Sequence, residues 1–326
     1  MHIAPVLDLA ALRDFHEVES AALAHDFVAL PADPFDELVP LLDCTPRAGE
    51  LRLLFLGTED GVPVGALSMK LPQLDNLSSV NIDGSVHPDH RRRGLASALF
   101  GFALEEVRRH GRTRVHVEAP WAQDGSEGAA FPILRAAGAR PVLDDYRRIL
   151  DLAAHPAGSP HPVPQGYRVV QWVDAAPETV VDGCAYLVGR MTVDAPMGDM
   201  DYEQEKWDAA RYRENEATTL ARNRRCVGTA VVHEATGQVA GVTDIGVNRD
   251  RTAIAYQWNT IVDPDHRGKQ LGLVLKTWNH HFLVQQVPGV THINTWNAAS
   301  NTFMVAVNDA VGYHIAEKWT EWQLDL

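Results

Sequence analysis

Cysteine is scarce in this sequence of 326 residues, and so is positive charge. The three cysteines, Cys44, Cys184 and Cys226, are far apart and lack metal-ligand spacing, so neither a disulfide framework nor a metal site is expected. A reducing, cytoplasmic compartment fits this usage best. Lysine and arginine number 29 against 43 aspartates and glutamates, a formal net charge of −14. That balance argues against nucleic acid as a partner and favours a cationic or amine-bearing small molecule.

Long apolar runs are also absent. No uninterrupted run approaches the roughly 20 residues needed to span a membrane, and residues 1–5 lack the basic start and apolar core of a signal peptide. Hydrophobic residues nevertheless make up 45% of the chain, and its length exceeds one typical core. The sequence thus predicts a globular protein of two domains, with no membrane partner, as a monomer or homodimer.

One short motif occurs twice. Residues 86–96 read VHPDHRRRGLA and residues 262–272 read VDPDHRGKQLG, with five of the first six letters identical. The copies lie about half the chain apart, as expected for a duplicated domain. Each follows an apolar, strand-like run and precedes apolar residues at helical spacing, such as Leu95 and Leu99 in the first copy. Each copy therefore predicts a strand-to-helix turn.

A turn of this kind leaves backbone N–H groups unpaired at the positive end of the helix dipole. Phosphate is the usual occupant of such a site. Gly94 allows the chain to approach a diphosphate closely, and Arg91, Arg92 and Arg93 add positive charge nearby. The alternative is a polar loop that caps an ordinary helix. The second copy of the motif favours the anion site.

The spacing RxxGxA, formed by Arg91, Gly94 and Ala96, resembles the pyrophosphate-binding motif of the GCN5-related N-acetyltransferases, the GNAT superfamily. In each half, the order of helices, a hairpin, then strand, turn, helix, strand, helix and strand is also similar to that fold. The resemblance implies an α/β (α+β) protein of two tandem acetyltransferase domains, each a mixed twisted sheet flanked by helices.

The domain boundaries follow from composition. Residues 153–165 are rich in proline, glycine and histidine and have no apolar periodicity, which is typical of an extended linker. We therefore expect one acetyltransferase domain at 1–152 and the other at 166–326.

The resemblance implies acetyl-CoA as cosubstrate and no metal. Val86 and Val262 would supply a backbone N–H near the thioester carbonyl, and Asn301 matches a family asparagine that bonds the coenzyme arm. The residues assigned to the coenzyme are Val86, Arg91, Arg92, Arg93, Gly94, Leu95, Ala96, Val262, Arg267, Gly268, Lys269, Gln270, Leu271, Gly272 and Asn301.

Two features depart from the family pattern. Gln270 stands where the second turn should have its first glycine, so a side chain is expected where the diphosphate usually packs. The tyrosine that protonates the leaving thiolate in many members is replaced by Leu134 in the first half and by Asn308 in the second. Because a thiol has a pKa near 8.5, water could supply that proton and activity need not be lost.

Polar residues gather at the strand ends of the second half, which favours that half for acetyl transfer. Tyr256 and Asn297 are expected in the acceptor site, and so is Asp194, in a segment similar to one that borders the acceptor pocket in tandem members. The residues that follow predict a long, highly charged helix over 202–221, and capping of that helix by Asp199 is an equal alternative for the segment. The first half would then bind coenzyme structurally or as a second site.

The expected reaction is attack of a small molecule's neutral amine on the acetyl thioester, with a carboxylate, histidine, tyrosine or water taking the ammonium proton. Two other functions stay open. One is a non-catalytic protein that binds acyl-CoA or a small ligand on the same scaffold, which the absent tyrosines keep open. The other is transfer of a longer acyl group.

Overall fold

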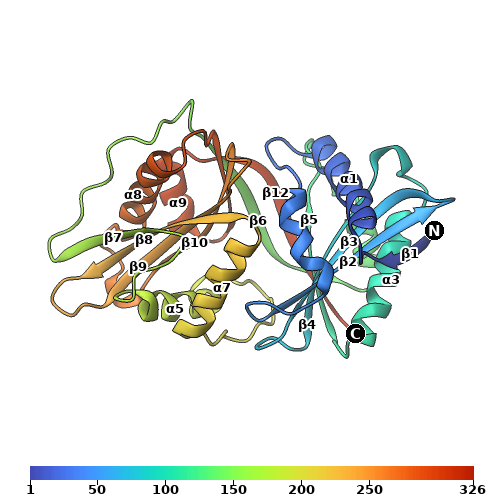
Figure 1. Cartoon of the computed structure of the whole chain (residues 1–326), viewed down its shortest axis with the longest axis horizontal. Coiled ribbons are helices and arrows are strands. Elements are labelled where there is room, and N and C mark those ends of the chain that lie inside the picture. Colours follow the sequence, from blue (N-terminus) through green and yellow to red (C-terminus); the bar gives the residue numbers. More distant parts are fainter. The chain divides into compact units, whose positions relative to one another are not determined.

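The computed structural model describes all residues from Met1 to Leu326, and they form two compact units (Figure 1). The N-terminal unit comprises Met1–Asp145, Gly198–Tyr202 and Glu317–Leu326. The C-terminal unit comprises Tyr146–Met197 and Glu203–Ala316. The expected α/β class, a mixed sheet flanked by helices in each half, is confirmed.

In the N-terminal unit the strand order is β1-β2-β3-β4-β5-β12. The strands are β1 (His2–Pro5), β2 (Glu50–Glu59), β3 (Val62–Pro72), β4 (Ser79–Val86), β5 (Arg114–Pro120) and β12 (His314–Asp325). The helices are α1 (Leu9–Asp26), α2 (Phe35–Leu38), η1 (Val39–Asp43), η2 (Pro88–His90), α3 (Leu95–Arg109) and α4 (Phe131–Ala136). The hairpin and the strand-turn-helix expected from the sequence are both present.

In the C-terminal unit, which contains β6 only from Tyr146 onward, the order is β6-β11-β10-β9-β8-β7. The strands are β6 (Arg140–Asp151), β7 (Tyr167–Val173), β8 (Arg224–His233), β9 (Val239–Asn248), β10 (Ile254–Val262) and β11 (His292–Ala298). The helices are α5 (Val181–Gly189), α6 (Met191–Asp194), α7 (Ala209–Ala221), η3 (Pro264–His266), α8 (Leu271–Gln286) and α9 (Thr302–Val311). This unit thus repeats the strand-turn-helix of the first.

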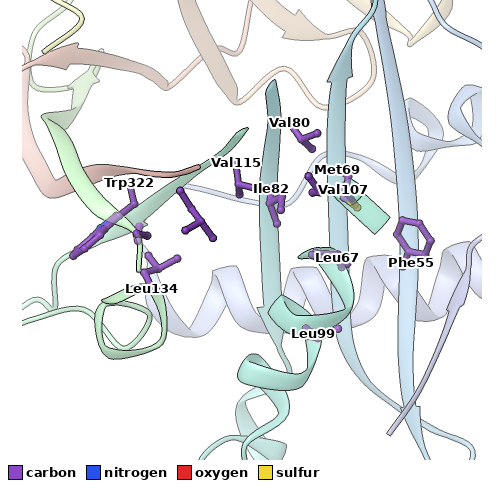
Figure 2. Close-up of a cluster of buried hydrophobic side chains, with 14 of the residues drawn as sticks. Phe55, Leu67, Met69, Val80, Ile82, Leu99, Val107, Val115, Leu134 and Trp322 are labelled. Atoms are coloured by element: carbon purple, nitrogen blue, oxygen red, sulfur yellow. The ribbon is translucent and has the colours of Figure 1, made fainter. Parts of the chain in front are cut away.

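The two faces of the N-terminal sheet differ because side chains alternate along each strand. One face carries Leu67, Val80 and Val115, which pack with Leu99 of α3 in the main hydrophobic core (Figure 2). The opposite face of β2 and β3 packs against α1 through a second apolar cluster that includes Leu54. Residues of β4 and β5 that point away from α3 therefore share the α1 side of the sheet.

The last strand of each half does not follow the expected domain ranges. Trp319–Asp325 of β12 pairs antiparallel with Arg114–Pro120 of β5, so the C-terminal end of the chain completes the N-terminal unit. Tyr146–Asp151, at the end of the expected first domain, belongs to the C-terminal unit. The ranges 1–152 and 166–326 stay a prediction about the duplicated halves, whereas the compact units exchange their final strand segments.

The segment before α7 differs from the expectation. A helix over 202–221 was expected, but α7 starts at Ala209, and the carboxylate of Asp208 caps it by accepting from the N–H of Arg211. Asp199 therefore does not cap this helix. Tyr202 instead lies in the N-terminal unit, where its hydroxyl donates to Asn81 Oδ1 at 2.9 Å.

None of the helices combines the length and the apolar composition required to cross a bilayer.

Trp322 tests the placement of the last strand. Its side chain is 2% exposed and packs in the core of the N-terminal unit, so Trp322→Ala should lower the free energy of unfolding by about 3–5 kcal/mol in urea titrations. Ile315, on the same strand, is 48% exposed, and Ile315→Ala should change it by less than about 0.5 kcal/mol. Equal effects of the two substitutions would contradict the strand exchange.

Candidate active site

The turn after β4 has free space beside its backbone at Gly94. Gly94, with a φ of +80°, is the N-cap residue of α3 and has no side chain to cap the helix. The first backbone N–H groups of α3 therefore receive no side-chain hydrogen bond from this residue. A Cβ added at Gly94 would meet no atom within 4 Å. The backbone fits the expected cradle for a diphosphate.

The turn after β10 has the same backbone conformation with different side chains. Gly268 (φ +78°) matches Arg92 (φ +64°), and Gln270 (φ +58°) matches Gly94. Gln270 therefore adopts the left-handed conformation in spite of its side chain, which usually costs about 1–2 kcal/mol. Its Oε1 lies 3.2 Å from Nε2 of His161 in the expected linker, so this side chain has a partner within its own unit.

The first arginine of each turn braces it. The Arg91 Nε donates to the carbonyl of Val86 at 3.1 Å, and the Arg267 Nε donates to that of Val262 at 3.3 Å. The Arg91 guanidinium also makes two bonds of 2.8 and 2.9 Å with Asp26, at the end of α1. Burial would raise the pKa of Asp26, but these bonds hold it below its usual range. Arg91 is thus a positioning group with its charge already paired.

The remaining turn residues divide between surface and core. Arg93 pairs with Glu59 at 2.8 Å, and the Lys269 Nζ lies 6.0 Å from the centre of the Tyr167 ring. Arg92 is exposed. Leu95 and Leu271, the first helical residues, are buried and anchor each helix to its sheet. Ala96 and Gly272 follow them in the first helical turn.

Beyond the turns, the strand that leads into each one separates from its parallel neighbour. β4 pairs with β5 only at Ser79–Asn81, and β10 pairs with β11 only at Ile254–Tyr256. The N–H groups of His87 and Asp263 donate to the antiparallel neighbour on the other side. Because successive N–H groups point to opposite edges of a strand, those of Val86 and Val262 point into the separation. This is the direction expected if these N–H groups donate to the thioester carbonyl.

Only one of these two strands contains a β-bulge. The register between β9 and β10 shifts between Gln257 and Thr260, whereas β3 and β4 stay in register throughout. The bulge is held by the Asp244 carboxylate, which accepts from the Asn259 N–H at 2.9 Å. Burial raises the pKa of Asp244, and the Asn259 bonds oppose that rise.

Three carboxylates converge in the N-terminal unit. Glu118 of β5 lies opposite Glu321 of β12 in the ladder, and both approach Asp145 of β6, with one oxygen from each residue within 4.8 Å of the others. None of the three has a hydrogen bond or an ion pair, whereas neighbouring Asp144 pairs with Lys318 at 2.8 Å. We call Glu118, Asp145 and Glu321 the acidic triad. Sequence reasoning missed it, because its members come from distant strands.

Burial and mutual repulsion disfavour ionisation of the triad. Burial, followed by the nearby Asp145 charge, raises the pKa of Glu321 to about 7. Burial and Asp144 raise the pKa of Asp145 to about 6. Burial and Glu321 raise that of Glu118 well above its usual value. Asp145 and Glu321 therefore exchange protons near neutral pH, as a general base must.

More acidic groups lie on the same face of the sheet. Asp83 of β4 acts on the pKa values of both Glu118 and Glu321, and it pairs with Lys70 at 3.4 Å. Burial, followed by the charge of Asp33, raises the pKa of Glu19 of α1 to about 7. The charge of Asp83 also contributes to this rise. The face is thus strongly acidic around the end of β4.

The expected acceptor residues of the second half each have their own partners. Tyr256 stacks on Trp296, with ring centres 6.4 Å apart. Asp194 accepts two 2.8 Å bonds from Arg190 and lies 3.4 Å from Arg267, so it braces the second turn as Asp26 braces the first. The acceptor roles of these residues stay a prediction.

The other two asparagines expected in the second half are also engaged. Asn297 is buried, and its Oδ1 accepts from Asn308 at 2.9 Å. Asn301 caps α9 by accepting from the N–H of Met304 at 3.1 Å.

A buried lysine, also missed from the sequence, completes the network around Asn308. The Lys276 Nζ donates to Asn308 Oδ1 at 2.7 Å and is 1% exposed. Burial, followed by the Arg148 charge, lowers the pKa of Lys276 to about 7. The position of the family's proton donor is therefore held by an amide bonded on both sides.

Comparison with known families supports the resemblance. The model of the Acetyltransferase (GNAT) family matches residues 15–126, which include β4, the first turn and α3. Mycothiol acetyltransferase from Cellulomonas flavigena is 29% identical over 149 residues. This match spans 42% of the chain and 41% of that relative, less than half of either protein.

Solved structures match over the whole chain. A tandem GNAT protein from the clavulanic acid biosynthesis pathway is 27% identical, with a TM-score of 0.83 over 99% of this chain and 98% of its own. A GCN5-related N-acetyltransferase from Sphaerobacter thermophilus covers 99% of this chain and 95% of its own with a TM-score of 0.68; at 16% identity it shows the fold alone.

The chain has the tandem acetyltransferase fold, and its residues 15–126 match the model of the Acetyltransferase (GNAT) family. The resemblance carried by Arg91, Gly94 and Ala96 is confirmed at this level.

The acidic triad predicts a pH-dependent stability. The pKa of Glu321 is raised from 4.5 to about 7 in the folded state, so the folded protein loses stability as pH rises through this window. Glu321→Gln should remove that loss, so it should stabilise the protein by about 1–2 kcal/mol at pH 8 and by less at pH 5. Urea titrations at both pH values measure this. Exposed Glu105 of α3 is the control, and a pH-independent gain for Glu321→Gln would contradict the argument.

Proposed function

We propose that this protein transfers the acetyl group of acetyl-CoA to the amine of a small molecule, and that the N-terminal unit carries out the reaction. One observation supports this above others. An open helix-start turn ends β4, and uncompensated carboxylates lie on the adjoining strands of the same sheet. Anion cradle and proton acceptor are the two parts that acetyl transfer to an amine requires.

The residues present fit the coenzyme. The space above Gly94 is open, the first turn of α3 offers backbone donors, and the Val86 N–H points into the separation of β4 from β5. Bound acetyl-CoA would supply the thioester. The chain would hold its diphosphate at the turn and polarise the carbonyl through Val86.

The triad supplies the base. An arriving ammonium has no lone pair, and a carboxylate whose pKa is near 7 accepts its proton at neutral pH. The amine nitrogen then forms the C–N bond as the C–S bond breaks. The second proton that the nitrogen loses passes through water to the leaving thiolate, because Leu134 replaces the family tyrosine. Glu118 and Glu321 share this task, since they face each other across the ladder.

The comparisons support acetyl transfer in general terms. The family model matches residues 15–126 of the N-terminal unit, and the curated relative is named for acetylation of mycothiol. The net charge of −14 and the acidic face agree with a cationic acceptor and disfavour nucleic acid. Three free cysteines agree with a reducing, cytoplasmic location.

The contacts within the C-terminal unit favour a second function there, which is ligand binding without catalysis. Its turn keeps the cradle conformation, but Asn308 is locked between Lys276 and Asn297, and Asp194 is paired with arginines. These contacts support coenzyme or ligand binding without catalysis in this unit. They favour the N-terminal unit for transfer, in contrast to the preference drawn from the polar strand ends.

Substitutions at Gly94 and Gly268 distinguish coenzyme binding at the N-terminal turn from coenzyme binding at the C-terminal turn. A valine at either position adds a β-branched side chain where φ is positive, and Gly94→Val should raise the Kd for acetyl-CoA at the N-terminal cradle at least tenfold by calorimetry. Gly268→Val should act in the same way on the C-terminal cradle. Gly101→Val, also in open space but within α3, is the matched control. Unchanged binding in both turn variants would exclude the turns as coenzyme sites.

The base can be located by kinetics. The double variant Glu118→Gln with Glu321→Gln should lower kcat by roughly 10²–10⁴ with little change in the Kd of acetyl-CoA, because neither residue lies in the turn. Tyr256→Phe should leave kcat within twofold. The reverse result, a loss in Tyr256→Phe and none in the double variant, would assign transfer to the C-terminal unit. Coenzyme release with a panel of amines measures both.

A further inference from the structure

The surplus of negative charge around the triad narrows the chemical class of the acceptor amine. The cations on this face of the N-terminal sheet are already paired with carboxylates outside the triad. Lys70 pairs with Asp83 and Arg52 with Asp33, both at 3.4 Å. Arg114 of β5 pairs with Asp325 at 2.9 Å. Glu19 and the three triad carboxylates have no ion pair. A buried or half-buried charge without a partner is costly, so the face is built for cations that come from outside the chain.

Glu19 is the second, independent indication of a ligand. It belongs to α1, not to the strands of the triad, and its Oε2 atom is buried without a hydrogen-bond partner. Its carboxylate and the triad both respond to Asp83. Glu19 is not among the carboxylates whose oxygens converge within 4.8 Å, so one ammonium group that contacts all three triad members leaves Glu19 without a partner.

We propose that the acceptor is an aliphatic amine with at least two cationic groups, a diamine or polyamine, bound by the acidic triad together with the Asp83 and Glu19 side of the same face. This inference rests on the proposed function and specifies its substrate class. An ammonium has three N–H donors, which match three converging carboxylates. A second ammonium on the same chain neutralises charge that a monoamine leaves uncompensated.

Proton release accompanies this mode of binding. Cations favour the ionised form of nearby carboxylates, so a diamine should displace protons that the raised pKa values of the triad retain near neutral pH. A monoamine should displace fewer. Calorimetry in two buffers of different ionisation enthalpy counts these protons directly.

The test compares 1,4-diaminobutane with 1-aminobutane, which have the same carbon chain, by calorimetry of the full-length protein at pH 7 without coenzyme. We expect the diamine to bind at least tenfold more tightly and to release more protons. Glu118→Gln and Glu321→Gln should each weaken diamine binding at least tenfold, and Glu105→Gln should not change it. Thermal melting checks that each variant is folded.

Equal affinity for the two amines, or diamine binding insensitive to the triad variants, would overturn the proposal. Mg²⁺ or Mn²⁺ alone is titrated in parallel; triad-dependent metal binding without diamine binding would make the triad a metal site and also overturn it. Turnover with acetyl-CoA separates this inference from the proposed function. Diamine binding without turnover refutes only the transfer, and equal turnover of both amines refutes only the diamine preference.

Discussion

The separation of β4 from β5 after three paired residues is the constraint on which the rest of the N-terminal unit depends. A fully paired parallel ladder would use the N–H of Val86 and bring the strands into contact along their length. Because pairing stops at Asn81, the backbone beyond it is available to a ligand. The same separation ends at the open turn of Gly94 and borders the strand that carries Glu118.

Stability and function oppose each other at the triad. Three acidic groups with raised pKa values and no cation among them destabilise the folded chain at neutral pH. The neighbouring ion pairs, Lys70–Asp83 and Lys318–Asp144, show that this fold readily places lysines beside carboxylates where stability alone requires it. The exception at the triad is what a base and a cation site require.

The two units demonstrate how one backbone supports different chemistry. Both turns have the same conformation, and both are braced by an arginine paired with an aspartate, Arg91 with Asp26 and Arg267 with Asp194. The side chains around them differ. One unit places unpaired carboxylates near the separated strand, and the other contains a buried lysine whose amide partner occupies the proton-donor position. Fold duplication therefore does not imply a duplicated active site.

The sequence by itself determined the resemblance to the superfamily, the two turns and most of the element order. These features are local: a glycine at positive φ, apolar periodicity, and a motif repeated at a fixed distance each act within a few residues of the chain. The long helix expected over 202–221 failed at its start because Asp208 caps it and Tyr202 packs in the other unit. Only the tertiary structure brought Asp194 to Arg267, moved the last strand segments between units, and assembled the triad from positions 118, 145 and 321. Such groups meet through strand pairing between distant segments, and no local pattern of residues encodes that meeting.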